Sequence, residues 1–173
     1  MSPQKVTSIW LVPNSEDGAR IKHISDQLAD AQKGARFQPH ITLGSLTTSE
    51  PDLNAMFGAA PAVELKPIEI DRTDTFTMAL FIRLEISPQL AELRAALESA
   101  KGFRASRTFD PHVSLCYGSP PEHLGLSVHF SELLDHPVRF NQIWAMEINV
   151  PVETHANVRT WRKIASIELN EVS

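Results

Sequence analysis

The sequence predicts a single bilobal α+β domain spanning residues 1–173, with antiparallel sheets lining a central cleft between two pseudo-symmetric halves and with helices outside. Two observations support this fold class. A seven-residue pattern, Phe-x-Pro-His-apolar-Ser/Thr-Leu, occurs at 37–43 and again at 109–115, each time after a strand, a capped helix and a loop. Two copies are too few for a solenoid, and the strands between them are too discontinuous for a doubly wound parallel sheet.

The first half begins with a short β-rich strand that Pro13 closes, because proline lacks the N–H that a strand interior needs. Asn14 or Ser15 can cap the helix that follows, and Gly34 is expected to end it, since glycine tolerates the left-handed conformation. The predicted elements are a strand at 7–12, this helix, a strand at 39–46, a short helix opened by 49–51 and continued through 57, and β-rich stretches at 62–70 and 76–86.

The second half begins with Ser87 followed by Pro88, a pair typical of a helix start because serine caps the helix and proline suits its first turn. Gly102 is expected to end this helix. The remaining predicted elements are a strand at 112–117, a partly helical segment at 120–134 that carries Leu124 and Leu126, and strands at 138–150 and 158–169.

Composition restricts the partners that we expect. The net charge is −5 and no run of five basic residues occurs, so the chain lacks the positive face of a protein that grips long nucleic acids. A nucleic-acid substrate would be small or bound only at its end. With one cysteine, no signal-like N-terminus and no apolar run of membrane-spanning length, we expect a monomer in the cytoplasm that neither spans nor binds a membrane.

Each copy of the pattern places a histidine and a hydroxyl on the same side of a strand, because alternate side chains share a face. His40 shares its face with Thr42, and His112 shares its face with Ser114. The residues between them are apolar and can pack on helices. Bringing the halves together therefore builds a site with two imidazoles and two hydroxyls.

That set of side chains suits the hydrolysis of a cyclic phosphodiester. The reaction needs a base to deprotonate water and an acid to protonate the leaving oxygen, and histidine can do either near neutral pH. The hydroxyls can donate hydrogen bonds to the non-bridging phosphate oxygens. No metal is required by such chemistry, and we expect no cofactor.

A bare His-x-Ser/Thr pattern is a weak signal, since it also occurs at 23–25 and 129–131. His23 lies in a predicted helix, where positions i and i+2 point apart, and Ser131 is expected to cap a helix. One histidine on an apolar strand is more often a core residue than a catalytic one. The long pattern in duplicate reverses that expectation for His40 and His112.

Other chemistries lack their usual sequence patterns. The remaining histidines, among them His123, His136 and His155, show no zinc-ligand spacing. Cys116 is not followed by the arginine that a cysteine phosphatase needs six residues later, so packing is its expected role. No nucleophile elbow and no glycine-rich nucleotide loop occur.

The chain resembles the two-histidine (2H) phosphoesterase superfamily, and most closely its plant and fungal cyclic phosphodiesterases, over the segments 8–13, 39–42 and 111–117. The resemblance implies hydrolysis of 2′,3′-cyclic nucleotides to 2′-phosphates, with catalytic roles for the two motif histidines and substrate-binding roles for the two motif hydroxyls. ADP-ribose 1″,2″-cyclic phosphate, a by-product of tRNA splicing, is the other substrate implied. The resemblance also suggests that His112 is the base and His40 the acid.

Three aromatic residues are further candidates for substrate binding. Tyr117 matches a tyrosine that lines the pocket of the plant relatives, although strict alternation would turn it away from His112 unless the strand ends there. Trp10 and Phe76 can offer aromatic surface to a base, with core packing as the favoured alternative.

Two alternatives to this function remain open. One is an RNA-end or 2′–5′ phosphodiesterase of the same superfamily, which would be expected to need a longer and more basic groove. The other is a non-catalytic module that binds nucleotides or RNA ends. Two imidazoles favour the enzyme, because arginine or lysine would serve phosphate binding better.

Overall fold

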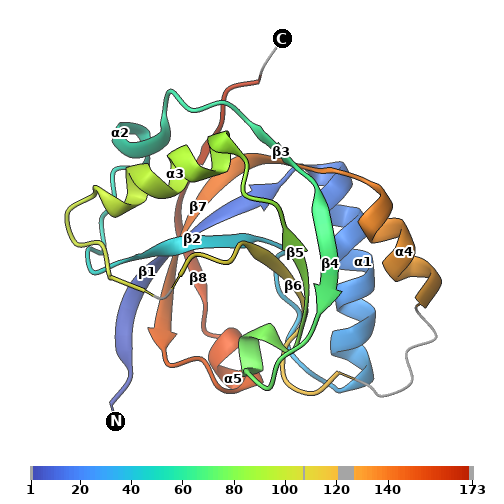
Figure 1. Cartoon of the computed structure of the whole chain (residues 1–173). Helices are drawn as coiled ribbons and strands as arrows, with labels where there is room; N and C mark the ends of the chain where they lie inside the picture. Colours follow the sequence, from blue (N-terminus) through green and yellow to red (C-terminus); the bar gives the residue numbers. More distant parts are fainter. Residues whose placement is uncertain (1, 107, 121–126, 172–173) are drawn as a thin grey trace.

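The structure is a computed structural model that describes residues 2–106, 108–120 and 127–171 (Figure 1). Its elements in chain order are β1 (Gln4–Pro13), α1 (Ser15–Ala31), β2 (Ile41–Leu46), α2 (Leu53–Phe57), β3 (Val63–Leu65), β4 (Pro67–Asp71), the 3₁₀ turn η1 (Phe76–Met78), β5 (Leu80–Leu84), α3 (Pro88–Glu98), β6 (His112–Cys116), α4 (Ser127–Asp135), β7 (Val138–Val150), α5 (His155–Val158) and β8 (Arg162–Glu168).

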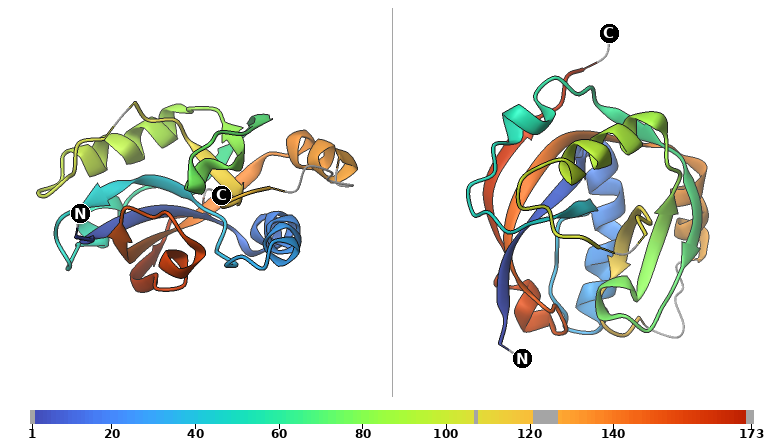
Figure 2. Two further views of the ribbon diagram at one scale, coloured as in Figure 1. Left: turned by 90° about the horizontal axis from the view of Figure 1, so that it is seen from below. Right: turned by 60° about the vertical axis from the view of Figure 1, so that its left-hand side comes forward.

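The strands form one antiparallel sheet in the order β3-β7-β1-β2-β6-β5-β4, and β8 also pairs with β7. The sheet curls strongly, and α1, α3 and α4 lie around its outside (Figures 1 and 2). Helix α1 packs on β1 and β6, whereas α3 packs on β2. The α+β class, the antiparallel pairing and the outer helices are confirmed, and the sheets of the two halves are continuous.

The two motif strands, β2 and β6, are neighbours near the middle of this sheet. They share one register pair, Ile41 opposite Val113. Continued in both directions, this antiparallel register sets His40 opposite Ser114 and Thr42 opposite His112 on one face. The repeat in the sequence is therefore an approximate two-fold axis in the structure.

The opposite face of the motif strands forms the core. Ile41, Leu43, Val113 and Leu115 have no exposed surface and pack in one apolar cluster with residues of α1 and α3. Burial of an aliphatic side chain of this size contributes roughly 1.5–3 kcal/mol. The predicted division of each strand into a packed side and a polar side is confirmed.

Two helix starts follow the predicted caps, and the end of α1 departs from its prediction by one residue. The Asn14 side chain accepts a hydrogen bond from the backbone of Asp17, and Ser87 caps α3 in the same way through Leu90. Lys33, with φ of 55°, takes the left-handed conformation expected of Gly34, whose N–H instead bonds to Ala29.

Three other helix predictions are wrong by a few residues. Helix α2 is capped by Asp52 rather than opened at 49–51, and α3 ends at Glu98, before the turn that contains Gly102. Ser131 lies inside α4 rather than at its start. Leu124 and Leu126 of the expected helical segment, and His123, fall outside the described residues.

The strand predictions differ in accuracy. β7 has the predicted bounds 138–150, and β6 ends one residue early. The stretch 62–70 is two strands, because β3 pairs with β7 whereas β4 pairs with β5. The predicted strand at 76–86 begins as the turn η1, and the one at 158–169 begins only at Arg162, after α5. None of the helices in the described part of the chain is long and apolar enough to cross a membrane.

Candidate active site

A cavity of about 340 Å³ opens on the face of the sheet that carries both motifs. His40, Thr42, His112 and Ser114 all line it. They come from β2, from β6 and from the residue just before β2, so the pairing of these two strands brings together side chains that lie 72 positions apart in the sequence. The four motif residues predicted to meet do meet.

Both imidazole rings are oriented by the same backbone contact. Nδ1 of His40 lies 2.7 Å from the carbonyl oxygen of Gln38, and Nδ1 of His112 lies 2.8 Å from that of Asp110. A carbonyl oxygen only accepts, so Nδ1 carries the proton in each ring. No described residue hydrogen-bonds to Nε2 of either ring, so this atom is available to a ligand in the cavity.

His40 is buried, with 7% of its surface exposed, and it stacks on Trp10 with ring centroids 3.5 Å apart and an interplanar angle of 4°. Burial lowers the pKa of His40 to about 3, against the opposing effect of its hydrogen bond to Gln38, and the nearby His112 lowers that pKa further. His40 is therefore a neutral imidazole at neutral pH.

His112 is half-buried and so more exposed than His40. The rings of Phe81 and His112 meet in an edge-on arrangement, with centroids 5.1 Å apart. Arg83, its partner across the β5–β6 pair, binds both carboxylate oxygens of Asp110 at 3.0 and 3.2 Å. Because the Asp110 carbonyl holds Nδ1 of His112, Arg83 anchors the residue that orients this ring.

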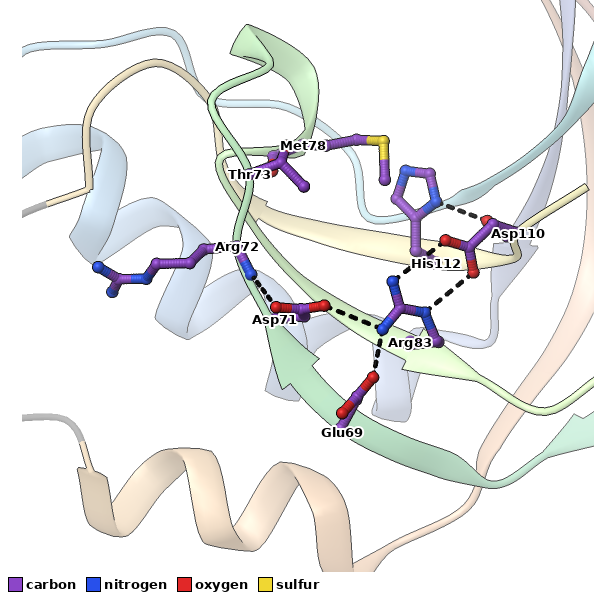
Figure 3. Close-up of polar contacts among 8 residues, drawn as sticks. All are labelled: Glu69, Asp71, Arg72, Thr73, Met78, Arg83, Asp110 and His112. Carbon is purple, nitrogen blue, oxygen red and sulfur yellow. Dashed lines mark hydrogen bonds and ion pairs between the residues drawn. The ribbon is translucent and has the colours of Figure 1, made fainter. Parts of the chain in front are cut away.

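Arg83 also binds Asp71 at 3.0 Å, and it contacts Glu69 (Figure 3). The carboxylate of Asp110, followed by those of Asp71 and Glu69, raises the pKa of Arg83 above its ordinary value. The pKa of the Asp71 carboxyl is lowered by the backbone N–H of Arg72 and then by Arg83. Three acidic residues therefore surround one guanidinium beside His112.

The two motif hydroxyls are not equivalent either. Ser114 is buried, and its hydroxyl donates to the carbonyl oxygen of Thr77 at 2.6 Å. Thr42 is exposed, and among the described residues nothing binds its hydroxyl. In this arrangement Thr42 is ready to donate to a ligand, whereas Ser114 must first leave Thr77.

Tyr117 and Trp10 line the cavity, and Phe76 does not. β6 ends at Cys116 and Gly118 has φ of 84°, so the turn brings Tyr117 to the cavity side, where it stacks on Phe37 with centroids 3.9 Å apart. Burial raises the pKa of the Tyr117 phenol. Phe76 packs against Tyr117, outside the cavity wall, at 5.8 Å.

Trp161 is a wall residue that the sequence reasoning missed. It lies before β8, and its ring meets Trp10 and Tyr117 edge-on at 5.4 and 5.8 Å. Its indole N–H is buried without a partner among the described residues. A tryptophan at the start of a late β-rich stretch was the only signal, because no motif surrounds it.

Cys116 does not line this cavity. It belongs to the apolar core, where burial raises the pKa of its thiol to about 11, and the side-chain amide of Gln32 donates to its sulfur at 3.0 Å. A thiol held in this way is protonated at neutral pH and is a poor nucleophile. Packing, the role favoured from the sequence, agrees with this environment.

Comparisons with known proteins place this geometry in context. The chain is 26% identical over 122 residues to a cyclic phosphodiesterase from Arabidopsis thaliana, covering 68% of this chain and 67% of that protein. Among solved structures it is similar to Escherichia coli LigT in complex with 3′-AMP, with a TM-score of 0.57 and 14% identity over 96% of this chain and 98% of that one. A second structure, described as a phosphoesterase, has the same TM-score and identity over 98% and 99% of the two chains. No protein-family model matches the sequence.

Proposed function

We propose that the chain is a member of the two-histidine (2H) phosphoesterase superfamily and acts as a metal-independent hydrolase of cyclic phosphodiesters. Its proposed substrates are 2′,3′-cyclic nucleotides, opened to 2′-phosphates, and ADP-ribose 1″,2″-cyclic phosphate. A role in the metabolism of tRNA-splicing by-products follows from the second substrate. The name of the Arabidopsis relative and the 3′-AMP bound to LigT support a small nucleotide as the ligand.

One observation carries the proposal: two imidazole rings and a threonine hydroxyl line one small cavity, and within the described part of the chain neither the Nε2 atoms nor this hydroxyl has a hydrogen-bond partner. A phosphate between the rings would meet a proton acceptor, a proton donor and a neutral hydrogen-bond donor. General acid–base catalysis of this kind contributes roughly 10²–10⁴-fold to the rate. The aromatic wall of Trp10, Tyr117 and Trp161 can accommodate the nucleoside.

We assign the base to His40 and the acid to His112. Because burial lowers the pKa of His40 to about 3, its neutral ring in the free protein can take a proton but has none to give at Nε2. His40 would remove a proton from water as the water oxygen bonds to phosphorus. The ring P–O bond then breaks, and His112 protonates the leaving ribose oxygen. The product is a phosphate monoester.

These roles are the reverse of those that the resemblance suggests, and an activated substrate separates the two assignments. A phenolate leaves without needing a proton, so an aryl phosphodiester makes the acid dispensable. His112→Ala should recover most of its lost rate on a p-nitrophenyl phosphodiester, and His40→Ala should not. Recovery of the rate in His40→Ala but not in His112→Ala would show that His112 is the base.

The activity itself is tested with the four 2′,3′-cyclic nucleotides and ADP-ribose cyclic phosphate in the presence of EDTA, with identification of the phosphate isomer formed. We expect a 2′-phosphate product and a rate that chelation does not change. If chelation abolished turnover and a divalent ion restored it, the metal-independent mechanism would be wrong. Tight binding of the nucleotides without any turnover would favour the non-catalytic module.

A further inference from the structure

The catalytic cavity continues into a second chamber of about 570 Å³. The two cavities share wall residues, among them Thr42 and His112, so they are parts of one cleft. The second chamber extends along β1 and β2, past Gly44 and Ser45, toward Val6. Ser45 lies three residues beyond Thr42, which is about 10 Å along a strand. A ligand larger than a cyclic phosphate can therefore reach this chamber from the catalytic histidines.

Arg104 is a wall residue of this chamber and is held there by the backbone. Its N–H donates to the carbonyl oxygen of Ser45 at 3.0 Å. Next to it, Phe103 forms a β-bridge with Leu46, and the carbonyl oxygen of Gly102 accepts from Thr47. The backbone of residues 102–104 therefore lies along the end of β2, and this fixes the position of the Arg104 backbone beside the chamber.

Within the described residues, the hydrogen-bond partners of the Arg104 guanidinium are neutral and distant. It lies 3.4 Å from Ser45 Oγ and 3.4 Å from Gln4 Oε1, at the long end of the hydrogen-bond range. Among the residues that the structure describes, no carboxylate forms an ion pair with it. Exchanging these two contacts for contacts with an anion would therefore cost little free energy.

The other charged groups of the chamber are already paired. Arg94 binds Glu98 at 2.8 Å and the carbonyl oxygen of Leu43. Asp110 has both carboxylate oxygens bound by Arg83. Among the described residues that line the chamber, and apart from the catalytic His112, Arg104 is therefore the cationic group that has no carboxylate partner.

We propose that Arg104 forms a subsite for a second phosphate on the same substrate molecule, carried on the 5′ side of the nucleoside whose cyclic phosphate lies between the histidines. This inference rests on the proposed function and narrows its substrate class. One arginine without a carboxylate partner among the described residues can bind one additional anionic group, which agrees with a net charge of −5. The planar guanidinium suits a phosphate, which it can bind through two N–H groups.

Kinetics with two matched substrates test the subsite. Adenosine 2′,3′-cyclic phosphate lacks the second phosphate, and adenosine 5′-phosphate 2′,3′-cyclic phosphate carries it. We expect kcat/KM to be about 10-fold higher for the second compound, mainly through KM, as is typical of one charge-assisted hydrogen-bonding contact. Added salt should shrink this preference. Equal kcat/KM values for the two compounds at low salt would overturn the inference.

Variants then locate the subsite. Arg104→Gln should abolish the preference, and Arg104→Lys should keep part of it. Lys101→Gln removes a positive charge from the same loop at an exposed residue outside this chamber, and it should keep the preference in full. The preference is the ratio of kcat/KM for the two substrates, measured with one preparation of each variant. A fraction of unfolded protein lowers both values equally and does not change this ratio. A preference that survives in Arg104→Gln would place the second phosphate elsewhere.

Two further measurements complete the test. A dinucleotide ending in a cyclic phosphate, compared with the 5′-phosphorylated mononucleotide, distinguishes an RNA end from a free nucleotide as the source of the second phosphate. If no compound is turned over, the proposed function fails, and calorimetric binding of adenosine 2′,5′-bisphosphate against adenosine 2′-phosphate still tests the subsite. Tighter binding of the bisphosphate than of the monophosphate by the wild type, but not by Arg104→Gln, would support the subsite. Equal affinity of the wild type for the two compounds would overturn it.

Discussion

His40 and His112 occupy equivalent positions in the two halves of the sheet but have different neighbours. His40 is buried beneath Trp10, which depresses its pKa to about 3, whereas His112 is more exposed and lies beside Arg83 and three carboxylates. The strand pairing supplies the same backbone contact to both rings. The comparison teaches that the repeat builds the scaffold twice, while residues outside the repeat give each copy its own chemistry.

The largest expected effect comes from removing either ring. His40→Ala and His112→Ala should each lower kcat by a factor of about 10²–10⁴, because each removes one acid–base group. Steady-state kinetics on a 2′,3′-cyclic nucleotide measure this. His23→Ala is the matched control, since it changes an exposed histidine of α1 that also has serine two residues on. Near-normal turnover by either site variant would disprove two-histidine catalysis.

The hydroxyls provide the next contrast. Thr42→Ala should raise the barrier by roughly 2 kcal/mol, measured as kcat, since it removes a hydroxyl that is free to bind phosphate. Ser114→Ala should cost less in kcat and about 1 kcal/mol in unfolding free energy, because its hydroxyl is bound to Thr77. Thr42→Ser, which keeps the hydroxyl, is the control. A larger kcat loss in Ser114→Ala would show that this hydroxyl turns toward the substrate.

Arg83 tests how the second half orients its ring. Arg83→Gln should lower kcat about 10-fold with little change in KM, because the anchor on Asp110 is lost while the cavity wall remains. Arg83→Lys should rescue little, since one ammonium cannot bind both carboxylate oxygens in the same plane. Arg162→Gln, which removes an exposed ion pair with Glu147, is a control for charge. An increase in KM as large as the decrease in kcat, or full recovery of kcat in Arg83→Lys, would contradict an orienting role.

The smallest expected effect is a pH dependence of stability. The pKa of His40 is about 3 in the folded protein and about 6.5 in the unfolded chain, so below pH 6.5 the unfolded chain binds a proton that the folded one does not. The stability due to neutral His40 is complete above that pH and is lost as the pH falls. Between pH 7 and 5.5 the loss should be about 1 kcal/mol.

Urea unfolding of the wild type and of His40→Asn at several pH values measures this difference. The pKa of His155 is also lowered by burial, and its Nδ1 accepts from the N–H of Ala35, so His155→Asn is needed as a parallel variant. Part of the acid sensitivity should disappear with each substitution. An unchanged pH dependence in His40→Asn would mean that this ring is not held neutral in the fold.

The sequence predicted the local features of the fold and the centre of the site. The faces of the two motif strands, the cap at Asn14 and the start of α3 depend on neighbouring residues, and they came out as expected. Features set by distant pairing did not. The stretch 62–70 divides because its two parts meet different strands, which no local pattern encodes.

The same limit applies around the site. Trp161 reaches the cavity through the pairing of β8 with β7, and Arg83 meets Asp110 across 27 residues of chain. Neither contact has a sequence signature of its own. Tyr117 lies between these two cases. Its side of the sheet depends on where β6 ends, and the alternation of side chains along a strand does not predict that end.

The approximate two-fold axis at Ile41 and Val113 relates two strands of one polypeptide. It is the symmetry that an isologous dimer of one half would have. In such a dimer every substitution appears at both rings, so neither could be buried without burying its twin. In a single polypeptide that constraint is absent, so one ring can be buried, as His40 is, while its counterpart His112 stays half-exposed.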